Sequence, residues 1–180
     1  KKFACRFVYL DRCPLKKSEN NMSHQPAKKR VVVTGMGIVS SIGQNLEDVT
    51  DALKNSRSGI SFCDDYQQNG LNSHVSGRVN CDFDAHIPRK YRKFMGPAAS
   101  YAYVAMQQAI EHAGLSTEQV SNPRVGIIAG SGGASTASQI EAIDALKTRG
   151  IRRVGLYRVT QTMGSTVSAC LATPFQIKGL

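Results

Sequence analysis

The apolar positions of this chain follow two alternating spacings from residue 30 onward. Residues 31–34 (VVVT) and 124–129 (RVGIIA) are continuous apolar runs, the pattern of strands that are buried on both faces. Four other segments have apolar side chains at helical spacing: 45–55, 95–115, 138–147 and 159–172. The segment 95–115 is the strongest, since it is rich in alanine and stops at Gly114, and we expect it to be central and largely buried.

This order of elements predicts an α/β fold. Strands that alternate with helices and consist of continuous apolar residues are typical of layers in which helices cover a sheet. Residues 61–88 are rich in Asp, Asn, Gln and Gly, which favours surface loops. No apolar run approaches the roughly 18 residues of a membrane span, so we expect none.

Residues 1–28 differ in character from the rest. They show no useful periodicity and no apolar core of a signal peptide. Met22 lies within them and is followed by polar residues. We interpret 1–28 as an extension or read-through that is disordered, with Met22 as a candidate natural start; a transit peptide is a weaker alternative because serine is scarce.

The net charge of +10 first points to an acidic partner such as a nucleic acid. However, residues 1–30 hold nine of the 23 basic residues and only two of the 13 acidic ones. The other 150 residues carry a net charge of only +3, so the body of the protein is mildly basic and we expect no nucleic-acid partner.

The stretch RVVVTGMGIVSSIG, residues 30–43, invites comparison with a nucleotide-binding turn. A dinucleotide fingerprint requires G-x-G-x-x-G, whereas Gly35 and Gly37 are followed by a glycine only at position 43. The later GSGG, 130–133, lacks the Lys-Ser/Thr of a P-loop. We therefore interpret Gly35 and Gly37 as a tight turn with close packing, in which Val39 and Ile42 point inward.

Cysteine and histidine spacing predicts no metal site. The five cysteines form no CxxC pair and are odd in number, so we expect neither a disulfide framework nor zinc, and a reducing cytoplasm is the simplest compartment. The four histidines are scattered along the chain.

Four motifs in order resemble the N-terminal part of the β-ketoacyl-acyl-carrier-protein synthases, specifically the type I enzymes of bacterial fatty-acid synthesis. They are VVVTGMGIVSSIG, SRSGI, NPRVGIIAGSGG and VSACLATPFQIKG. The resemblance spans residues 29–180, with short gaps. It implies a thiolase-like fold, an αβαβα sandwich of two similar halves, of which this chain supplies most of the first, and a homodimer in the complete enzyme.

The resemblance also implies the chemistry. Such an enzyme takes an acyl group onto a cysteine thiolate, decarboxylates malonyl-carrier protein, and lets the resulting carbanion attack the acyl thioester. It uses no cofactor beyond the phosphopantetheine arm of acyl carrier protein. The family's nucleophilic cysteine would follow soon after Leu180 and its two histidines are absent, so the 180 residues hold no catalytic residue and we expect them to be inactive alone. We interpret Cys170, inside a helix of small residues, as a structural thiol.

Binding residues carry over position by position. The family docks acyl carrier protein on a basic patch, and the matching positions are Arg89, Lys90, Lys93, Arg149 and Arg152. From the residues alone, these charges are equally typical of a solvated face, although 89, 90 and 93 fall within one helical turn.

The family's acyl pocket matches three further positions. Gly133 and Ala134 match positions where a small side chain leaves room for the acyl chain, and Met163 matches a pocket position near the dimer interface. Without the resemblance, Met163 is equally typical of ordinary core. Two alternative functions stay open: a non-catalytic relative of the chain-length-factor type, and a nucleotide-binding α/β domain.

Overall fold

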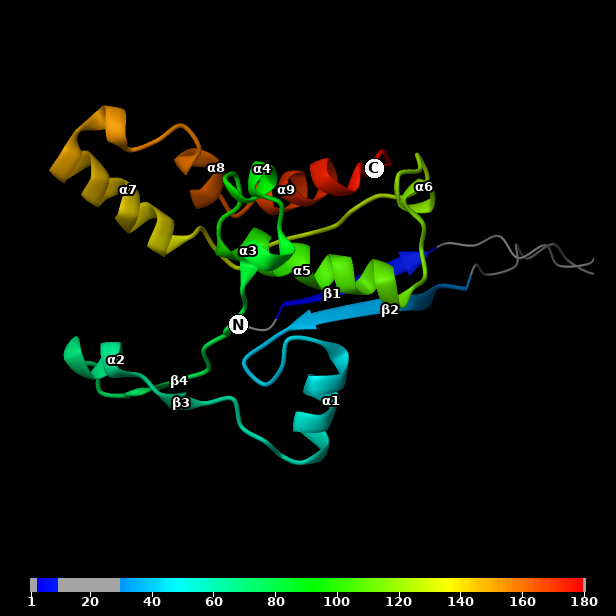
Figure 1. Ribbon diagram of the computed structural model, residues 1–180, viewed down its shortest axis with the longest axis horizontal. Helices are drawn as coiled ribbons and strands as arrows, with labels where there is room; N and C mark the ends of the chain where they lie inside the picture. Colours follow the sequence, from blue (N-terminus) through cyan, green and yellow to red (C-terminus); the bar gives the residue numbers. More distant parts are fainter. Residues whose placement is uncertain (1–2, 10–29, 180) are drawn as a thin grey trace, which may run out of the picture.

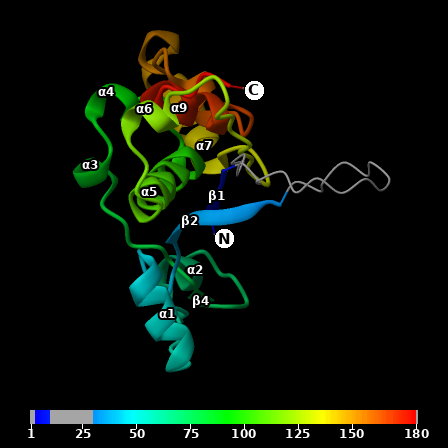
Figure 2. The same ribbon diagram turned by 90° about the vertical axis from the view of Figure 1, so that its right-hand side faces the viewer.

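The computed structural model describes residues 3–9 and 30–179. At its centre, β2 (Val32–Val39) pairs antiparallel with β1 (Phe3–Tyr9), with a register shift between Phe7 and Val8. Helix α5 (Pro97–His112) lies along both strands, and α9 (Thr166–Phe175) lies on the far side of α5 (Figure 1). Helix α1 (Leu46–Lys54) is on the opposite side of the sheet, as both views show (Figure 2).

Two glycines of β2 let α5 approach the sheet closely. A Cβ atom on Gly35 would overlap the Ala109 carbonyl oxygen, and one on Gly37 would overlap the Ala105 carbonyl oxygen. The expected close packing at these glycines is therefore confirmed. The expected tight turn is wrong, because the strand continues through both glycines to Val39.

The burial of β2 also differs from expectation. Val32 and Val33 are exposed, and the buried positions of the strand are Gly35, Gly37 and Val39. Val39 points inward as predicted, whereas Ile42 is only half-buried. The apolar run thus forms a strand, but helix α5 covers only its second half.

Helix α5 is central and largely buried, as predicted. Its buried residues include Ala105, Met106 and Ala109, and Gly114 follows the helix with φ +64°, the left-handed conformation that favours glycine after a helix end. Tyr103 packs on Phe175 of α9 with ring centroids 4.9 Å apart.

The side chains of α5 also satisfy the edge of β2. The Met36 N–H donates to His112 Nδ1 at 3.1 Å, and the Ile38 N–H donates to Gln108 Oε1 at 3.0 Å. Buried or partly buried amides need such partners, so the helix replaces a neighbouring strand at these two positions.

The predicted helices at 45–55 and 138–147 are confirmed as α1 and α7 (Thr136–Arg149). Asn45 caps α1, since its side chain accepts a hydrogen bond from the Asp48 N–H at 2.8 Å. The remaining elements are short: β3 (Ser61–Phe62), α2 (Asp64–Gln68), β4 (Val75–Ser76), α3 (Phe83–His86), α4 (Arg89–Arg92), α6 (Thr117–Val120) and η1 (Ile151–Arg153).

The prediction of a buried strand at 124–129 is wrong. Val125 is buried, but Ile128 is fully exposed, and the segment belongs to neither of the sheets formed by the described residues. Val125 donates its N–H to Asn122 and accepts from the Gly179 N–H at 2.9 Å, which are loop contacts. An apolar run becomes a strand only where a neighbouring strand supplies hydrogen bonds, and no strand within residues 3–9 and 30–179 pairs with this one.

The predicted helix 159–172 is interrupted. It is divided into α8 (Arg158–Thr162) and α9 by a break at residues 163–165. The Thr162 carbonyl accepts a hydrogen bond from the Ser135 N–H at 3.0 Å, so the loop before α7 takes an acceptor that a continuous helix would have used.

Residues 3–9 also differ from the expectation of disorder for 1–28. They form β1 because β2 offers them a free edge, which a search for periodicity within the segment does not detect. The remaining residues of that segment, including Met22, lie outside the described residues.

Candidate functional site

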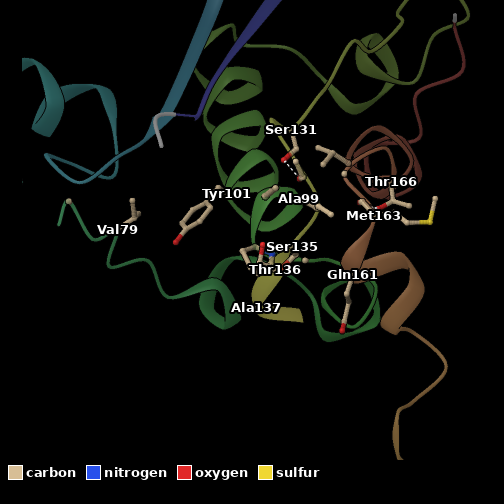
Figure 3. A pocket seen from close by; sticks show the side chains of 18 residues that line it. Val79, Ala99, Tyr101, Ser131, Ser135, Thr136, Ala137, Gln161, Met163 and Thr166 are labelled. Carbon is tan, nitrogen blue, oxygen red and sulfur yellow. Dashed lines mark hydrogen bonds between the residues drawn. The ribbon is translucent and has the colours of Figure 1, made fainter. Parts of the chain in front are cut away.

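A cavity of about 400 Å³ lies where three distant segments meet. The N-terminal end of α5 forms one wall, the loop 131–135 with the start of α7 forms the second, and the α8–α9 junction forms the third (Figure 3). Figure 3 shows Tyr101 and Val79 on one side and Met163 and Thr166 on the other. The cavity volume is in the range of small-molecule sites.

The three residues predicted for an acyl pocket all line this cavity. Gly133 and Ala134 belong to the loop before α7, and Met163 lies 30 positions later at the break between α8 and α9. The structure therefore brings the predicted set together, and the break in the predicted helix is what places Met163 at the cavity.

Hydrogen bonds fix the loop that carries Gly133. Ser131 Oγ donates to the Gly133 carbonyl at 2.9 Å, and Ser135 caps α7 by accepting from the Ser138 N–H at 3.3 Å. The Ser135 N–H in turn binds the Thr162 carbonyl, which ties the loop to α8. The cavity wall at Gly133 is thus held from both ends.

Space at Gly133 is free. A Cβ atom added there would meet no protein atom within 4 Å, and the same holds for Gly132, which does not line the cavity. Neither glycine has a positive φ. A side chain at Gly133 would therefore be tolerated by the backbone and would compete with whatever fills the cavity.

The opposite wall is anchored by the α8–α9 junction. Thr166 Oγ1 contacts the carbonyls of Thr160 and Met163, each at 2.7 Å. Gln161 Nε2 donates to the Lys93 carbonyl at 2.9 Å, which joins α8 to the end of α4. These bonds hold the wall that carries Met163.

The cavity lining carries no formal charge among the described residues. Its polar groups are the side chains of Ser, Thr, Gln and Tyr residues, and the rest of the lining is small or apolar. Burial raises the pKa of the Tyr101 phenol, and the nearby Cys81 adds to this, so the phenol is neutral at physiological pH. Tyr101 also packs edge-on against Phe83. Such a lining suits a neutral, largely aliphatic ligand.

The five residues predicted for carrier-protein docking fall into two groups. Arg89 and Lys90 lie in α4 and Lys93 follows it, all exposed, with the Lys93 ammonium 4.9 Å from the Tyr157 ring centroid. Arg149 ends α7 and Arg152 lies in η1, both exposed. Figure 1 shows this end of α7 on the far left, apart from α4.

Cys170 is half-buried on α9. Its thiol contacts the Phe94 carbonyl at 3.6 Å, and burial raises the pKa of the thiol. A thiol with a raised pKa is a poor nucleophile at neutral pH. That Cys170 has a structural role remains a prediction.

Comparison with known proteins now decides the family. The family described as "Beta-ketoacyl synthase, N-terminal domain" matches residues 28–180. The chain belongs to the β-ketoacyl synthase family. Its match begins within one residue of the boundary predicted from the motifs.

Named ketosynthases support this assignment. The chain is 48% identical to 3-oxoacyl-[acyl-carrier-protein] synthase 1 of Haemophilus influenzae over 153 residues, and 51% identical to that of Escherichia coli strain K12 over 154 residues. Each match covers 84% of this chain and 38% of the relative. The chain thus spans well under half the length of these relatives.

Solved structures confirm the predicted fold class. The β-ketoacyl synthase from Burkholderia phymatum STM815 superposes with a TM-score of 0.73 at 27% identity, covering 84% of this chain and 38% of its own. The AntDE:AntF ketosynthase complex, at 20% identity and a TM-score of 0.65, has the same fold and covers 85% of this chain and 41% of its own. The layered α/β ketosynthase fold is therefore shown for this part of the family's length.

Several cavity residues were not predicted from the sequence. Tyr101, Ser135 and Gln161 line the cavity, yet each belongs to a segment whose pattern indicates only a helix or a loop. Nothing in their local spacing marks them, because the cavity exists only once three segments meet.

Within residues 3–9 and 30–179, no helix has the length and apolar character needed to cross a bilayer, and no three His, Cys, Asp or Glu side chains are grouped to hold a metal ion.

Proposed function

We propose that this chain is the N-terminal part of a 3-oxoacyl-acyl-carrier-protein synthase of fatty-acid biosynthesis. The complete enzyme condenses an acyl thioester with malonyl-carrier protein. An acyl-cysteine thioester forms first; loss of CO₂ from the malonyl group leaves a carbanion, which attacks the acyl carbonyl and releases the cysteine thiolate.

One observation carries the proposal. Three positions that match the family's acyl pocket, Gly133, Ala134 and Met163, lie in different elements and line one uncharged cavity. The high identity to the synthase 1 enzymes of two bacteria supports the same activity. In this proposal the chain's own part is to hold the acyl chain, since a cavity lined by uncharged and mostly small or apolar residues favours aliphatic groups.

The partner in this proposal is acyl carrier protein. The AntDE:AntF structure holds an acyl-carrier protein together with its ketosynthase. In the present chain, Arg89, Lys90 and Lys93 are exposed in and just after α4. Gln161 of α8, which lines the cavity, donates a hydrogen bond to the Lys93 carbonyl and so joins α8 to this basic segment. An exposed basic group at this place favours association with an acidic carrier. Arg149 and Arg152 would form a second, separate contact.

A homodimer in the cytoplasm belongs to the same proposal. Helix α7 exposes Ile140, Ile143 and Leu146, and Leu156 and Val159 beyond it are also exposed. Exposed apolar residues gathered on one segment are typical of a contact surface. The remaining length of the enzyme and a second subunit are the two candidates to cover it, and the oligomeric state of the full-length protein distinguishes them.

The decisive experiment places a side chain in the cavity. Gly133→Leu, made in the full-length natural protein, should lower kcat/KM for long acyl substrates by about tenfold or more relative to short ones, because each excluded methylene is worth about 1–3 kcal/mol. Gly132→Leu is the matched control: a Cβ atom added there also meets no protein atom within 4 Å, but Gly132 does not line the cavity.

The readout is the ratio of kcat/KM for a long and a short acyl-carrier substrate. If Gly133→Leu leaves this ratio unchanged, or if Gly132→Leu changes it equally, the cavity does not hold the acyl chain. If the unaltered full-length protein performs no condensation with malonyl-carrier protein, the proposed activity itself is wrong.

A further inference from the structure

A second cleft, of about 330 Å³, lies between the α4 region and α9. Phe94 and Met95 line one side, and Ala169, Cys170 and Pro174 line the other. Apart from Thr166, its lining residues do not contribute to the cavity at Gly133. The cleft has a different character, because its walls are almost entirely carbon and sulfur with a single charge at the edge.

The polar groups in the walls are already engaged. Three threonines line the cleft, and each hydroxyl lies within hydrogen-bond distance of a backbone carbonyl: Thr160 with Tyr157 at 2.8 Å, Thr166 with Thr160 at 2.7 Å, and Thr173 with Ala169 at 3.0 Å. The Cys170 thiol contacts the Phe94 carbonyl. A ligand in the cleft would therefore meet an apolar wall, whose threonine hydroxyls already donate their protons to backbone carbonyls.

The charge at the edge is Lys90. No carboxylate forms an ion pair with Lys90 among the described residues, in contrast to Arg57, Arg78, Arg92 and Arg158. Its ammonium lies 4.7 Å from the Tyr91 ring centroid, and both residues line the cleft. Arg89 adds positive charge at the same helix. An apolar cleft with an unpaired cation at its edge is complementary to an amphiphile with an anionic end.

We propose that this cleft binds a medium-chain carboxylate, with its aliphatic tail between Phe94 and α9 and its carboxylate at Lys90. The volume is near the lower end of ordinary ligand pockets, which favours a medium rather than a long chain. This site is additional to the proposed synthase function, which places the acyl chain of the substrate in the cavity at Gly133. It gives the protein a place where a free fatty acid binds without entering the condensation.

Cys170 provides a reporter inside the cleft. The full-length natural protein is treated with N-ethylmaleimide at a fixed mildly alkaline pH, with and without octanoate, and modification of each cysteine is followed by peptide mass spectrometry. Octanoate should slow the modification of Cys170 and leave that of Cys81, which does not line the cleft, unchanged. Protection should persist in Gly133→Leu, because this substitution obstructs the other cavity and Gly133 does not line the cleft that contains Cys170.

Two charge variants test the carboxylate contact. Lys90→Gln should weaken octanoate binding, measured by the concentration that protects Cys170, by about fivefold, the effect of one partly exposed ion pair. Arg89→Gln removes the same charge from the neighbouring position, which does not line the cleft, and should change this concentration little. Octanol should protect less well than octanoate, and equally in both variants.

Any of three results would overturn the proposal. The first is that octanoate does not protect Cys170 in a protein that circular dichroism shows to be folded. The second is that Lys90→Gln and Arg89→Gln weaken octanoate binding equally, which would indicate general charge attraction. The third is that octanol protects Cys170 as well as octanoate does, which would indicate an apolar surface without a carboxylate contact.

Discussion

Replacing Gly37 by alanine tests whether the contact between β2 and α5 organises this domain. The Cβ atom of an alanine would overlap the carbonyl oxygen of Ala105 and would lie 2.8 Å from its carbonyl carbon and 2.9 Å from the Ala109 nitrogen. All three are backbone atoms of α5, so no flexible side chain can move aside. The strand and the helix must separate by about an ångström.

The cost follows from what α5 buries. Met106, Val104 and Ala105 of α5 are nearly inaccessible to solvent, and α9 packs on the same helix through Phe175. Overpacking of a close-packed core costs about 1–3 kcal/mol, and more where backbone must move. We expect Gly37→Ala to lower the free energy of unfolding by about 3 kcal/mol, at the upper end of that range.

Thermal unfolding of purified variants measures this cost. For a domain of 150–250 residues, about 1 kcal/mol corresponds to about 2–4 °C in Tm, so the midpoint should fall by several degrees. Gly132→Ala is the control, since its added methyl group meets open space and restricts the unfolded chain, and its midpoint should stay constant or rise slightly. Equal midpoints for the two variants would refute the argument from close packing.

Three further perturbations have defined outcomes. Asn45→Ala removes the cap of α1 and should destabilise the protein by about 1 kcal/mol in thermal unfolding, whereas an unchanged midpoint would mean that the cap contributes nothing. Burial raises the pKa of the Tyr101 phenol, and burial together with Tyr91 raises the pKa of the Tyr103 phenol. As the pH rises above about 10, these phenols lose their protons in the unfolded chain before they do so in the folded protein, so the free energy of unfolding should fall. Tyr103→Phe should reduce this fall, measured by thermal unfolding as a function of pH. Arg158→Gln breaks a 2.6 Å ion pair to Glu141 between α8 and α7. Because both side chains are partly exposed, the free energy of unfolding should fall by at most about 1 kcal/mol. A loss that does not shrink in high salt would contradict an ionic origin.

Helices with strong local signals were predictable from the sequence. The bounds of α1 and α5 lie within a few residues of the predictions, and the end of α5 is marked by Gly114. A helix depends on hydrogen bonds between residues four apart and on side chains that cap its ends, so its information is local. The four motifs are local in the same sense, since each is a short run of consecutive residues, and together they sufficed to identify the family.

Elements that depend on distant partners were not predictable in the same way. Residues 124–129 have the apolar character of a strand, but no strand in the described part of the chain pairs with them, while residues 3–9 lack an obvious pattern and nevertheless pair with β2. Strand formation requires hydrogen bonds from another segment, and the identity of that segment is not contained in the run itself.

The sequence by itself determined helices α1, α5 and α7, the family and the identity of three candidate pocket residues. Only the tertiary structure decided that Gly133, Ala134 and Met163 share one cavity, because the Ser135 N–H takes the Thr162 carbonyl and interrupts the helix that would otherwise run past Met163. It also decided that Gly35 and Gly37 serve packing rather than a turn, since the carbonyls of α5 occupy the space that side chains would need. Local periodicity specifies how a segment folds, whereas contacts between segments specify where its residues act.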